Sequence, residues 1–191
     1  GFLVRNMESY GILDAMGLTY RIVLDANIYT MNNRAEAFWM KKGILGDTVP
    51  LELNAKELVH RNNKNSELTV YGYTPMMVSV QCVQKTMDHC NHACVQYVLK
   101  DRYQKEFRGV CSCEFCYNTI YNTLPTSLLK EKEKAEKLGV KAYRLSFTIE
   151  TQQETEKIVR AFVDVYLRGQ KPDGQMQTEE TTKGHFQRGV E

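Results

Sequence analysis

The sequence lacks any apolar stretch that approaches the roughly 20 residues of a membrane-spanning helix. Residues 1–6 show neither a basic lead nor a small-residue cleavage site, so we expect no secretory signal there and a cytoplasmic protein. The formal net charge is only +2. Phosphate binding shows as clustered Lys and Arg rather than as a slight excess, so the charge neither indicates nor excludes RNA as a partner.

Two signatures of hydrolases are also missing. The sequence contains no H-E-x-x-H motif of a zinc peptidase and no G-x-S-x-G elbow of a serine hydrolase. Only four histidines occur, and two of them, His60 and His185, lie in a polar helix end and in the C-terminal tail. Protease chemistry therefore has little support. A cysteine nucleophile paired with His89 or His92 stays an alternative, because a neighbouring imidazole lowers the pKa of a thiol.

Cysteine is absent from most of the chain, since all six cysteines lie between residues 82 and 116 with the spacing C-x7-C-x3-C-x16-C-x-C-x2-C. The C-x2-C step at the end lets two thiolates hold one metal centre from a single turn. A metal or cluster site needs four ligands, and imidazole can replace sulfur in zinc sites and in some iron–sulfur centres. The eight candidate ligands are Cys82, His89, Cys90, His92, Cys94, Cys111, Cys113 and Cys116.

Three interpretations of these cysteines compete. A disulfide framework is typical of short secreted chains with small cores, whereas here the thiols occupy one segment of a long chain with many aliphatic residues elsewhere. Structural zinc and an iron–sulfur cluster share the same spacing rules, so spacing does not separate them. Finally, some of the six are ordinary thiols in any case, because only four ligands are needed.

The chain has 191 residues, of which 42% are hydrophobic and 25% charged, and this composition indicates one folded domain. Short apolar runs followed by polar N-caps and helical patterns alternate along it, which is typical of an α/β protein. We predict strands at 2–4, 20–24, 49–53 and 142–147 with one or two more within 68–79, and helices at 7–16, 35–42 and 126–138 and after Thr151. The predicted capping boxes are Asn33 with Glu36, Asn54 with Glu57, and Thr151 with Glu154.

This alternation fits part of a (β/α)8 barrel or an open parallel sheet. We predict a barrel-like domain over residues 1–169, a cysteine-rich insertion at about 80–118, and a tail at 170–191. No initiator Met is present and a strand begins at residue 2, so we expect a piece of a longer protein.

In both folds, ligands bind at the carboxyl ends of the strands. The polar residues at those positions are Arg5, Asn6, Asp25, Asn27, Glu52 and Asn54. The three asparagines are also good helix caps. Within a strand at 49–53, Glu52 would face away from both neighbouring leucines and would need either a task or a partner such as Arg5 or Arg144. Asp25, at a strand end, is expected to be exposed.

Several segments together resemble one known family. They are Leu51-Glu-Leu-Asn54, Val70-Tyr-Gly72, Pro75-Met-Met-Val78, Cys82-Val83, Leu99-Lys-Asp-Arg102, Cys113 with Cys116, Ile120-Tyr-Asn122, and residues 182–189 of the tail. The sequence resembles the collagenase-like peptidases, the group numbered thirty-two among peptidases of unknown catalytic type. The resemblance implies the second half of a (β/α)8 barrel with a cysteine-rich insertion.

The resemblance also implies a function. Better-understood relatives hydroxylate bases of ribosomal or transfer RNA, or the ring of ubiquinone precursors, and hold a four-iron, four-sulfur cluster on four cysteines. The positions that match those ligands best are Cys82, Cys90, Cys113 and Cys116, which leaves Cys94 and Cys111 as extras. We therefore expect an iron–sulfur-dependent RNA-base hydroxylase. A metal or cysteine peptidase and a non-catalytic module fixed by zinc are the alternatives.

In the hydroxylase hypothesis, strand-end groups line the substrate pocket, and aromatic and basic side chains near it stack a base. The pocket residues are Arg5, Asp25, Asn27 and Glu52, and the stacking candidates are Tyr71, Tyr73, Arg102 and Tyr103. Tyrosines in a barrel wall are more often core. His185 and Arg188 of the tail are candidates to reach a substrate anion, although surface loops carry such residues routinely.

Overall fold

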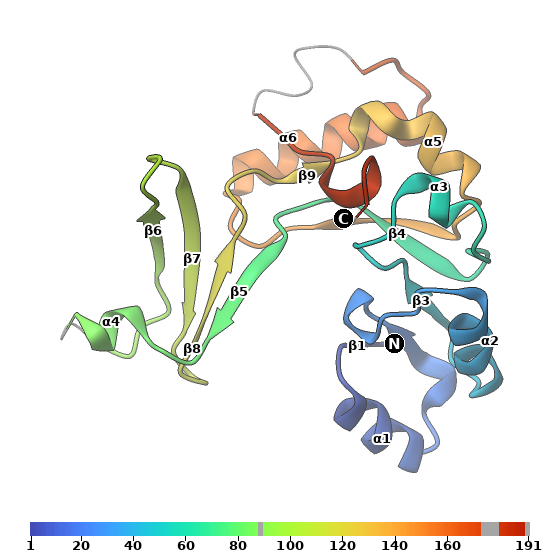
Figure 1. Cartoon of the computed structure of the whole chain (residues 1–191), viewed down its shortest axis with the longest axis horizontal. Helices are drawn as coiled ribbons and strands as arrows, with labels where there is room; N and C mark the ends of the chain where they lie inside the picture. The colour runs from blue at the N-terminus through green and yellow to red at the C-terminus, as the bar shows by residue number, and fades with distance from the viewer. Residues whose placement is uncertain (88–89, 173–179, 190–191) are drawn as a thin grey trace.

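The computed structural model describes residues 1–87, 90–172 and 180–189 (Figure 1). His89, a candidate ligand, and residues 173–179 and 190–191 of the tail lie outside these ranges. Two sheets build the fold, one parallel and one antiparallel. None of the helices in the described ranges has the length and apolar content needed to cross a lipid bilayer.

The first sheet is parallel and curls into a half-barrel (Figure 1). Its strands are, in spatial order, β1 (Phe2–Val4), β2 (Ile22–Leu24), β3 (Gly46–Thr48), β4 (Ser66–Gly72) and β10 (Ala142–Ser146), with β9 (Thr126–Ser127) antiparallel to β4. The predicted α/β class is confirmed. Because neighbouring parallel strands share their direction, their carboxyl ends meet at one edge of this sheet.

Helices pack on the outer face of the half-barrel. They are α1 (Met7–Ala15), α2 (Asn33–Lys41), α3 (Ala55–Leu58), α5 (Lys132–Lys137) and α6 (Gln152–Phe162), with 3₁₀ turns at Thr19–Arg21, Ala26–Ile28, Leu129–Glu131 and Gly184–Phe186. One core joins β1 and β2 to α1 and α2 through residues such as Leu24 and Trp39. A larger core joins β4 to α5 and α6 around Val70 and Phe162. Strand alternation therefore leaves the opposite, concave face to polar side chains.

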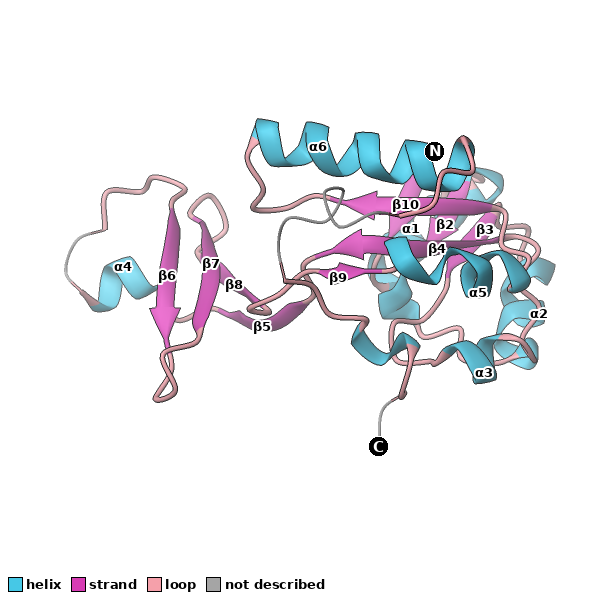
Figure 2. Ribbon diagram, turned by 90° about the horizontal axis from the view of Figure 1, so that it is seen from above, coloured by secondary structure: helices cyan, strands magenta, loops and turns pink. Residues whose placement is uncertain are grey.

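The second sheet is antiparallel and projects from the half-barrel (Figure 2). Its strands are β5 (Pro75–Ser79), β8 (Tyr117–Tyr121), β7 (Glu106–Ser112) and β6 (Gln96–Lys100), in this spatial order, and α4 (Val83–Thr86) lies beside it. All six cysteines belong to this part of the chain. In sequence it lies between β4 and β9, so both of its connections run to the half-barrel.

Most of the predicted helix starts are correct. Side-chain caps are confirmed at Asn6, at Asn54 with Glu57, and at Thr151 with Glu154. The predicted box of Asn33 with Glu36 is wrong, because the N-cap of α2 is Asn32, one residue earlier. Asn33 and Glu36 instead both bond Asn62: Asn33 Oδ1 accepts from its backbone N–H at 2.6 Å, and Glu36 Oε1 from its side-chain amide at 3.1 Å. The bonds of Asn62 with Asn33 and Glu36 thus link α2 to the loop between α3 and β4.

The predicted strand at 49–53 is wrong, since β3 lies at Gly46–Thr48. Val49 still donates to the Glu67 carbonyl at 2.8 Å, but Pro50 has no N–H and pairing ends there. Gly46 explains why the strand begins early: a Cβ at this position would lie 2.2 Å from the Asn65 carbonyl oxygen, so the neighbouring chain approaches where only glycine fits. Glu52 therefore sits in a turn.

The predicted helix at 126–138 is also wrong over its first half. Thr126 and Ser127 form β9, and α5 begins only at Lys132. The backbone donors in this segment pair with other elements: Ser127 N–H bonds the Thr182 carbonyl, and Leu128 N–H bonds the Val70 carbonyl. Tertiary pairing overrides the helical pattern here.

The apolar face of the last helix changes partway. Ile158 and Phe162 pack on the core. A π-helical turn then covers Val163–Leu167, and it brings Val165 into full burial while Leu167 is 78% exposed. The wider turn shifts the buried face relative to an α-helical spacing.

The tail is anchored to the half-barrel near Glu131. Phe186 is buried in the larger core, and Lys183 forms an ion pair with Glu131, which also pairs with Lys134 at 2.7 Å. Burial alone would raise the pKa of Glu131, but the hydrogen bonds and charges of the two lysines outweigh it and the pKa is lowered.

A Glu131→Gln variant is expected to lose about 1–2 kcal/mol of unfolding free energy at neutral pH, because two charge-assisted contacts disappear. A lowered folded-state pKa stabilises the fold above the unfolded pKa, and this contribution is lost as the pH falls below about 4. When urea unfolding is measured from pH 7 to pH 3, the unfolding free energies of the wild type and the variant should therefore converge at acid pH. The exposed Glu133 on the next turn, changed to Gln, is the control; an equal loss in that variant would contradict the assignment.

Candidate functional site

The six thiols converge beside the four-stranded sheet, and all are free. Cys82 is the N-cap residue of α4, Cys90 and Cys94 lie between α4 and β6, Cys111 is the last residue but one of β7, and Cys113 and Cys116 lie in the β7–β8 turn. That turn is closed by a Cys116 N–H to Cys113 carbonyl bond of 3.4 Å, with Cys116 in the left-handed region at φ 52°. The fold thus gathers distant cysteines into one neighbourhood.

The surroundings of Cys113 show how close this neighbourhood is. Burial, followed by the charges of the Cys94, Cys82, Cys90 and Cys116 thiols, raises the pKa of the Cys113 thiol. All the other cysteines named as ligands, and Cys94 in addition, therefore lie within electrostatic reach of Cys113.

Cys111 differs from Cys113 in its contacts. It is 1% exposed and its Sγ donates to Asn118 Oδ1 at 2.8 Å. The Asn118 amide nitrogen donates to the carbonyls of Gln81 at 2.8 Å and Ser79 at 3.5 Å, so its orientation is fixed and its oxygen requires a donor. Burial, and then the neighbouring thiols, raises the pKa of Cys111. The pKa of Cys113 is raised as well, so the features that favour Cys113 over Cys111 as a ligand are the burial of Cys111 and its bond to Asn118.

The donor set suits a metal centre chemically, because thiolates are the ligands of both iron–sulfur clusters and structural zinc. Within the described ranges, no three His, Cys, Asp or Glu side chains are arranged to hold a metal ion. Cys113 Sγ instead donates to the Ala93 carbonyl at 2.8 Å. The residues present therefore fit such a group by the type of their donor atoms, but the described side chains are not arranged as a metal site.

A charged network occupies the carboxyl edge of the parallel sheet. Arg5 Nε lies 3.0 Å from Asp25 Oδ2 and 3.4 Å from Asn27 Oδ1, so the structure brings together three of the four predicted pocket residues. Asp25 is only 9% exposed, and the expectation of an exposed carboxylate is wrong. Its second oxygen accepts from Arg144 Nη1 at 2.8 Å, so two guanidinium groups compensate its charge.

Arg144, which the sequence suggested only as a partner for Glu52, is the centre of this network. It also forms an ion pair with Glu67 and donates to Thr48 Oγ1 at 3.0 Å, while Thr48 donates to Glu67 at 2.8 Å. Glu67, Thr48 and Arg144 lie on adjacent strands and face the concave side. Sequence patterns could have found Arg144 as a lone cation within an otherwise apolar strand.

The fourth predicted residue, Glu52, does not join Arg5 or Arg144, whose partners among the described residues are Asp25, Asn27, Glu67 and Thr48. Its Oε2 atom is buried and has no hydrogen-bond partner within the described part of the chain. A buried, unpaired carboxylate oxygen is costly, as the sequence argument anticipated. This oxygen is buried because Glu52 lies in the turn after β3, and not because of side-chain alternation along a strand.

Tyr121, at the end of β8, connects the two sheets. Burial raises the pKa of its hydroxyl, and a hydrogen bond with Thr148 and the charge of Arg5 oppose this effect. Arg5 is therefore close to the antiparallel sheet. Side chains alternate along each strand, so the face carrying Tyr121 is opposite to the one carrying Cys111 and Asn118.

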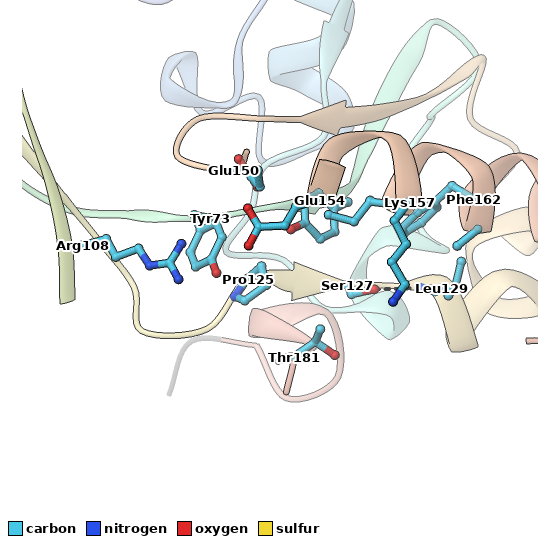
Figure 3. A pocket seen from close by; sticks show the side chains of 13 residues that line it. Tyr73, Arg108, Pro125, Ser127, Leu129, Glu150, Glu154, Lys157, Phe162 and Thr181 are labelled. Carbon is cyan, nitrogen blue, oxygen red and sulfur yellow. Dashed lines mark hydrogen bonds between the residues drawn. The ribbon is translucent and has the colours of Figure 1, made fainter. Parts of the chain in front are cut away.

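A small cavity of about 60 Å³ lies on this side, between the sheets (Figure 3). Arg108 of β7 points toward Tyr73, and Glu154 and Lys157 of α6 complete the polar wall. Tyr71 and Tyr73 are 4% and 8% exposed, so both are largely core, as expected for tyrosines in a sheet.

The remaining candidates for substrate contact lie on the surface. Arg102 covers the ring of exposed Tyr103, 4.7 Å from its centroid, in the turn between β6 and β7. His185 Nδ1 lies 2.9 Å from the Gly189 carbonyl within the turn of the tail, and Arg188 is exposed beside it. Neither group is joined to the network around Arg144 by the contacts described above.

Comparison with known proteins gives no match to any family model, to any curated protein or to any solved structure.

Proposed function

We propose that this chain is the cluster-bearing half of a (β/α)8-type barrel in a cytoplasmic protein that hydroxylates a base of ribosomal or transfer RNA. In this proposal the antiparallel sheet is a cysteine-rich insertion that holds a four-iron, four-sulfur cluster. The ligands are Cys82, Cys90, Cys113 and Cys116. The observation that carries the proposal is the convergence of these thiols from three separate segments around Cys113.

The thiol neighbourhood supports a resident metal group for an electrostatic reason. Several thiols that crowd together cannot all be charged unless a cation compensates them, and a bound metal supplies that compensation. A cluster of this kind, when bound, supplies one-electron redox chemistry. Cys111 lies among the other thiols, but its Sγ donates to Asn118, which favours the exposed and half-buried thiols as ligands.

The polar edge would bind and orient the substrate. Arg5 has a side chain that is 61% exposed, so it is the member of the network that can reach a phosphate or a base edge. Asp25 and Asn27 hold its guanidinium in place, and Asp25 is itself fixed by Arg144. The charge of Arg5 acts on Tyr121, which lies at the end of β8 on the face of the antiparallel sheet opposite to Cys111.

The test is a metal analysis of the full-length protein purified without oxygen. Iron and acid-labile sulfide near four per chain, with a brown colour, are expected for the wild type and are expected to be lost when Cys82, Cys90, Cys113 or Cys116 is changed singly to Ala. Cys94→Ala is the matched control and should keep its iron. In cells, the four ligand variants should also lose one added oxygen atom on an RNA base, measured by mass spectrometry of ribosomal and transfer RNA nucleosides.

Other outcomes lead to the alternatives. Colourless protein with stoichiometric zinc, which loses only stability on chelation, would identify a structural module. Peptide hydrolysis that a single change such as Cys94→Ala abolishes, with metal content unchanged, would identify a cysteine peptidase.

A further inference from the structure

One face of the antiparallel sheet carries two tyrosines and an arginine. Along β8 the side chains of Tyr117 and Tyr121 lie on the same side, opposite to Asn118. Arg108 of β7 lies on this side too, because Gly109 pairs with Ile120 and the side chains next to that pair point to the other face. The surface formed by these side chains is the Tyr121 face.

Within the described part of the chain, no element buries the Tyr121 face. The side chains that the four strands place on it are all exposed or half-buried, and Val78 and Val98 are 65% and 52% exposed. The opposite face differs, since α4 lies against it and Cys111 and Asn118 are buried there. The sheet is thus packed on one side and open on the other.

An aromatic pair lies at one end of the Tyr121 face. Phe115, in the β7–β8 turn between Cys113 and Cys116, is 70% exposed. Its ring stacks on that of Tyr117, with the centroids 6.4 Å apart and the planes 26° from parallel. A ring this exposed contributes little to the core. It presents the kind of surface on which an unpaired nucleobase stacks.

Two arginines lie at the other end. Arg108 is exposed and forms no ion pair within the residues that the structure describes. The Arg5 side chain is 61% exposed and its charge acts on the hydroxyl of Tyr121. Tyr117 and Tyr121 are separated by about 13 Å along the strand, so the rings and the cations lie within the span of a few nucleotides.

The carboxylates close to these cations are paired or shielded from solvent. Glu106, which β7 places on the same face, pairs with Lys100 at 3.0 Å. The side chain of Asp25, which holds Arg5, is only 11% exposed. A ligand that approaches from solvent therefore meets the guanidinium groups first, and a phosphate is their complement.

We propose that the Tyr121 face binds single-stranded RNA, with a base stacked on Phe115 and phosphates held by Arg108 and Arg5. This inference deepens the proposed function and rests on it for the choice of RNA, but it does not depend on a bound cluster. Single-stranded RNA fits because its bases are free to stack on the protein, whereas a duplex keeps them stacked on one another. A strand bound in this way would run from the turn that carries Cys113 and Cys116 to the edge that carries Arg5.

The experiment measures binding of a fluorescent single-stranded RNA of about ten nucleotides to the full-length protein by anisotropy. Phe115→Ala should weaken binding about 5- to 100-fold, as expected for the loss of one stacked base. Phe115→Trp should restore it, because the indole ring also stacks. Arg108→Met should weaken binding and reduce the slope of log affinity against log salt by about 0.7, the value for one phosphate contact on a single strand.

Two exposed side chains on outer helices provide matched controls. Phe38→Ala on α2 and Arg160→Met on α6 should bind the RNA as tightly as the wild type does. Wild-type affinity in both Phe115→Ala and Arg108→Met would overturn the role of the Tyr121 face and leave RNA as the substrate. Tighter binding of the same sequence as a duplex would also overturn it.

Iron content, measured on the same samples, separates this inference from the cluster. A colourless wild type that binds RNA, and that loses affinity in Phe115→Ala, supports the Tyr121 face and refutes the cluster. A brown wild type that binds no single-stranded RNA overturns the Tyr121 face and leaves the cluster standing.

Discussion

An Asp47→Ala variant is expected to lose about 3–5 kcal/mol of unfolding free energy, because it leaves the guanidinium of Arg61 buried without its counter-ion. The two side chains form an ion pair in which they are only 4% and 2% exposed. Asp47 lies in β3 and Arg61 follows α3, so the pair joins a strand to a loop on the outer face of the sheet.

Every remaining polar atom near this pair is satisfied, which is why its disruption should be expensive. Asp47 also accepts from Ser66 at 2.6 Å and from Thr30. Arg61 donates to the Thr30 carbonyl at 2.8 Å and to Asn63 Oδ1 at 2.9 Å. Removing the carboxylate therefore leaves the positive charge of Arg61 without a counter-ion inside this network. The low local dielectric makes such an unpaired charge costly.

Urea unfolding at neutral pH measures the effect as a fall in the transition midpoint at constant slope. Asp14→Ala, at an exposed position of α1, is the control and should change stability by less than about 0.5 kcal/mol. A loss as small as this in Asp47→Ala would mean that water reaches Arg61, and would contradict the buried pair. Arg61→Met together with Asp47→Ala should recover part of the loss, since no isolated charge then remains.

The α/β class and most helix starts could be predicted because they depend on local chemistry. A cap such as Asn6 or Thr151 bonds backbone groups within one turn, and both the residue type and its spacing are visible in the sequence. Strand β3 could not be placed in this way. Its position depends on the close approach of Asn65 to Gly46, a contact between two chain segments that no local pattern contains.

The same distinction between local patterns and long-range contacts applies to the candidate sites. Clustering of the thiols could be expected from their spacing, and Arg5, Asp25 and Asn27 could be brought together from the rule that parallel strands end at one edge. The contacts that separate one candidate residue from another, such as Cys111 from Cys113, come from parts of the chain that are distant in sequence. Asn118 identifies Cys111 as a protonated thiol, and its own orientation depends on carbonyls of the β5–α4 connection. No motif indicates such a second layer of contacts.

Changing Arg144 to Met is expected to lower the unfolding free energy by about 2–3 kcal/mol, because two carboxylates lose a charge-assisted partner in a partly buried setting. The side chains of Arg144, Asp25 and Glu67 are 20%, 11% and 23% exposed, so water compensates only part of the loss. Asp25 keeps Arg5, whereas among the residues that the structure describes Glu67 keeps only Thr48. Most of the cost should therefore arise at Glu67.

A double-mutant cycle with Glu67→Gln tests this assignment. If Glu67 carries most of the cost, Arg144→Met should destabilise the Glu67→Gln protein by at least about 1 kcal/mol less than it destabilises the wild type. Arg160→Met, on an 80% exposed side chain of α6, is the control and should have almost no effect. Additive effects of Arg144→Met and Glu67→Gln would contradict the pairing. Because Arg144 also fixes Asp25, and Asp25 holds Arg5, the same variant should loosen the exposed Arg5 guanidinium, and under the proposed function RNA affinity should fall together with stability.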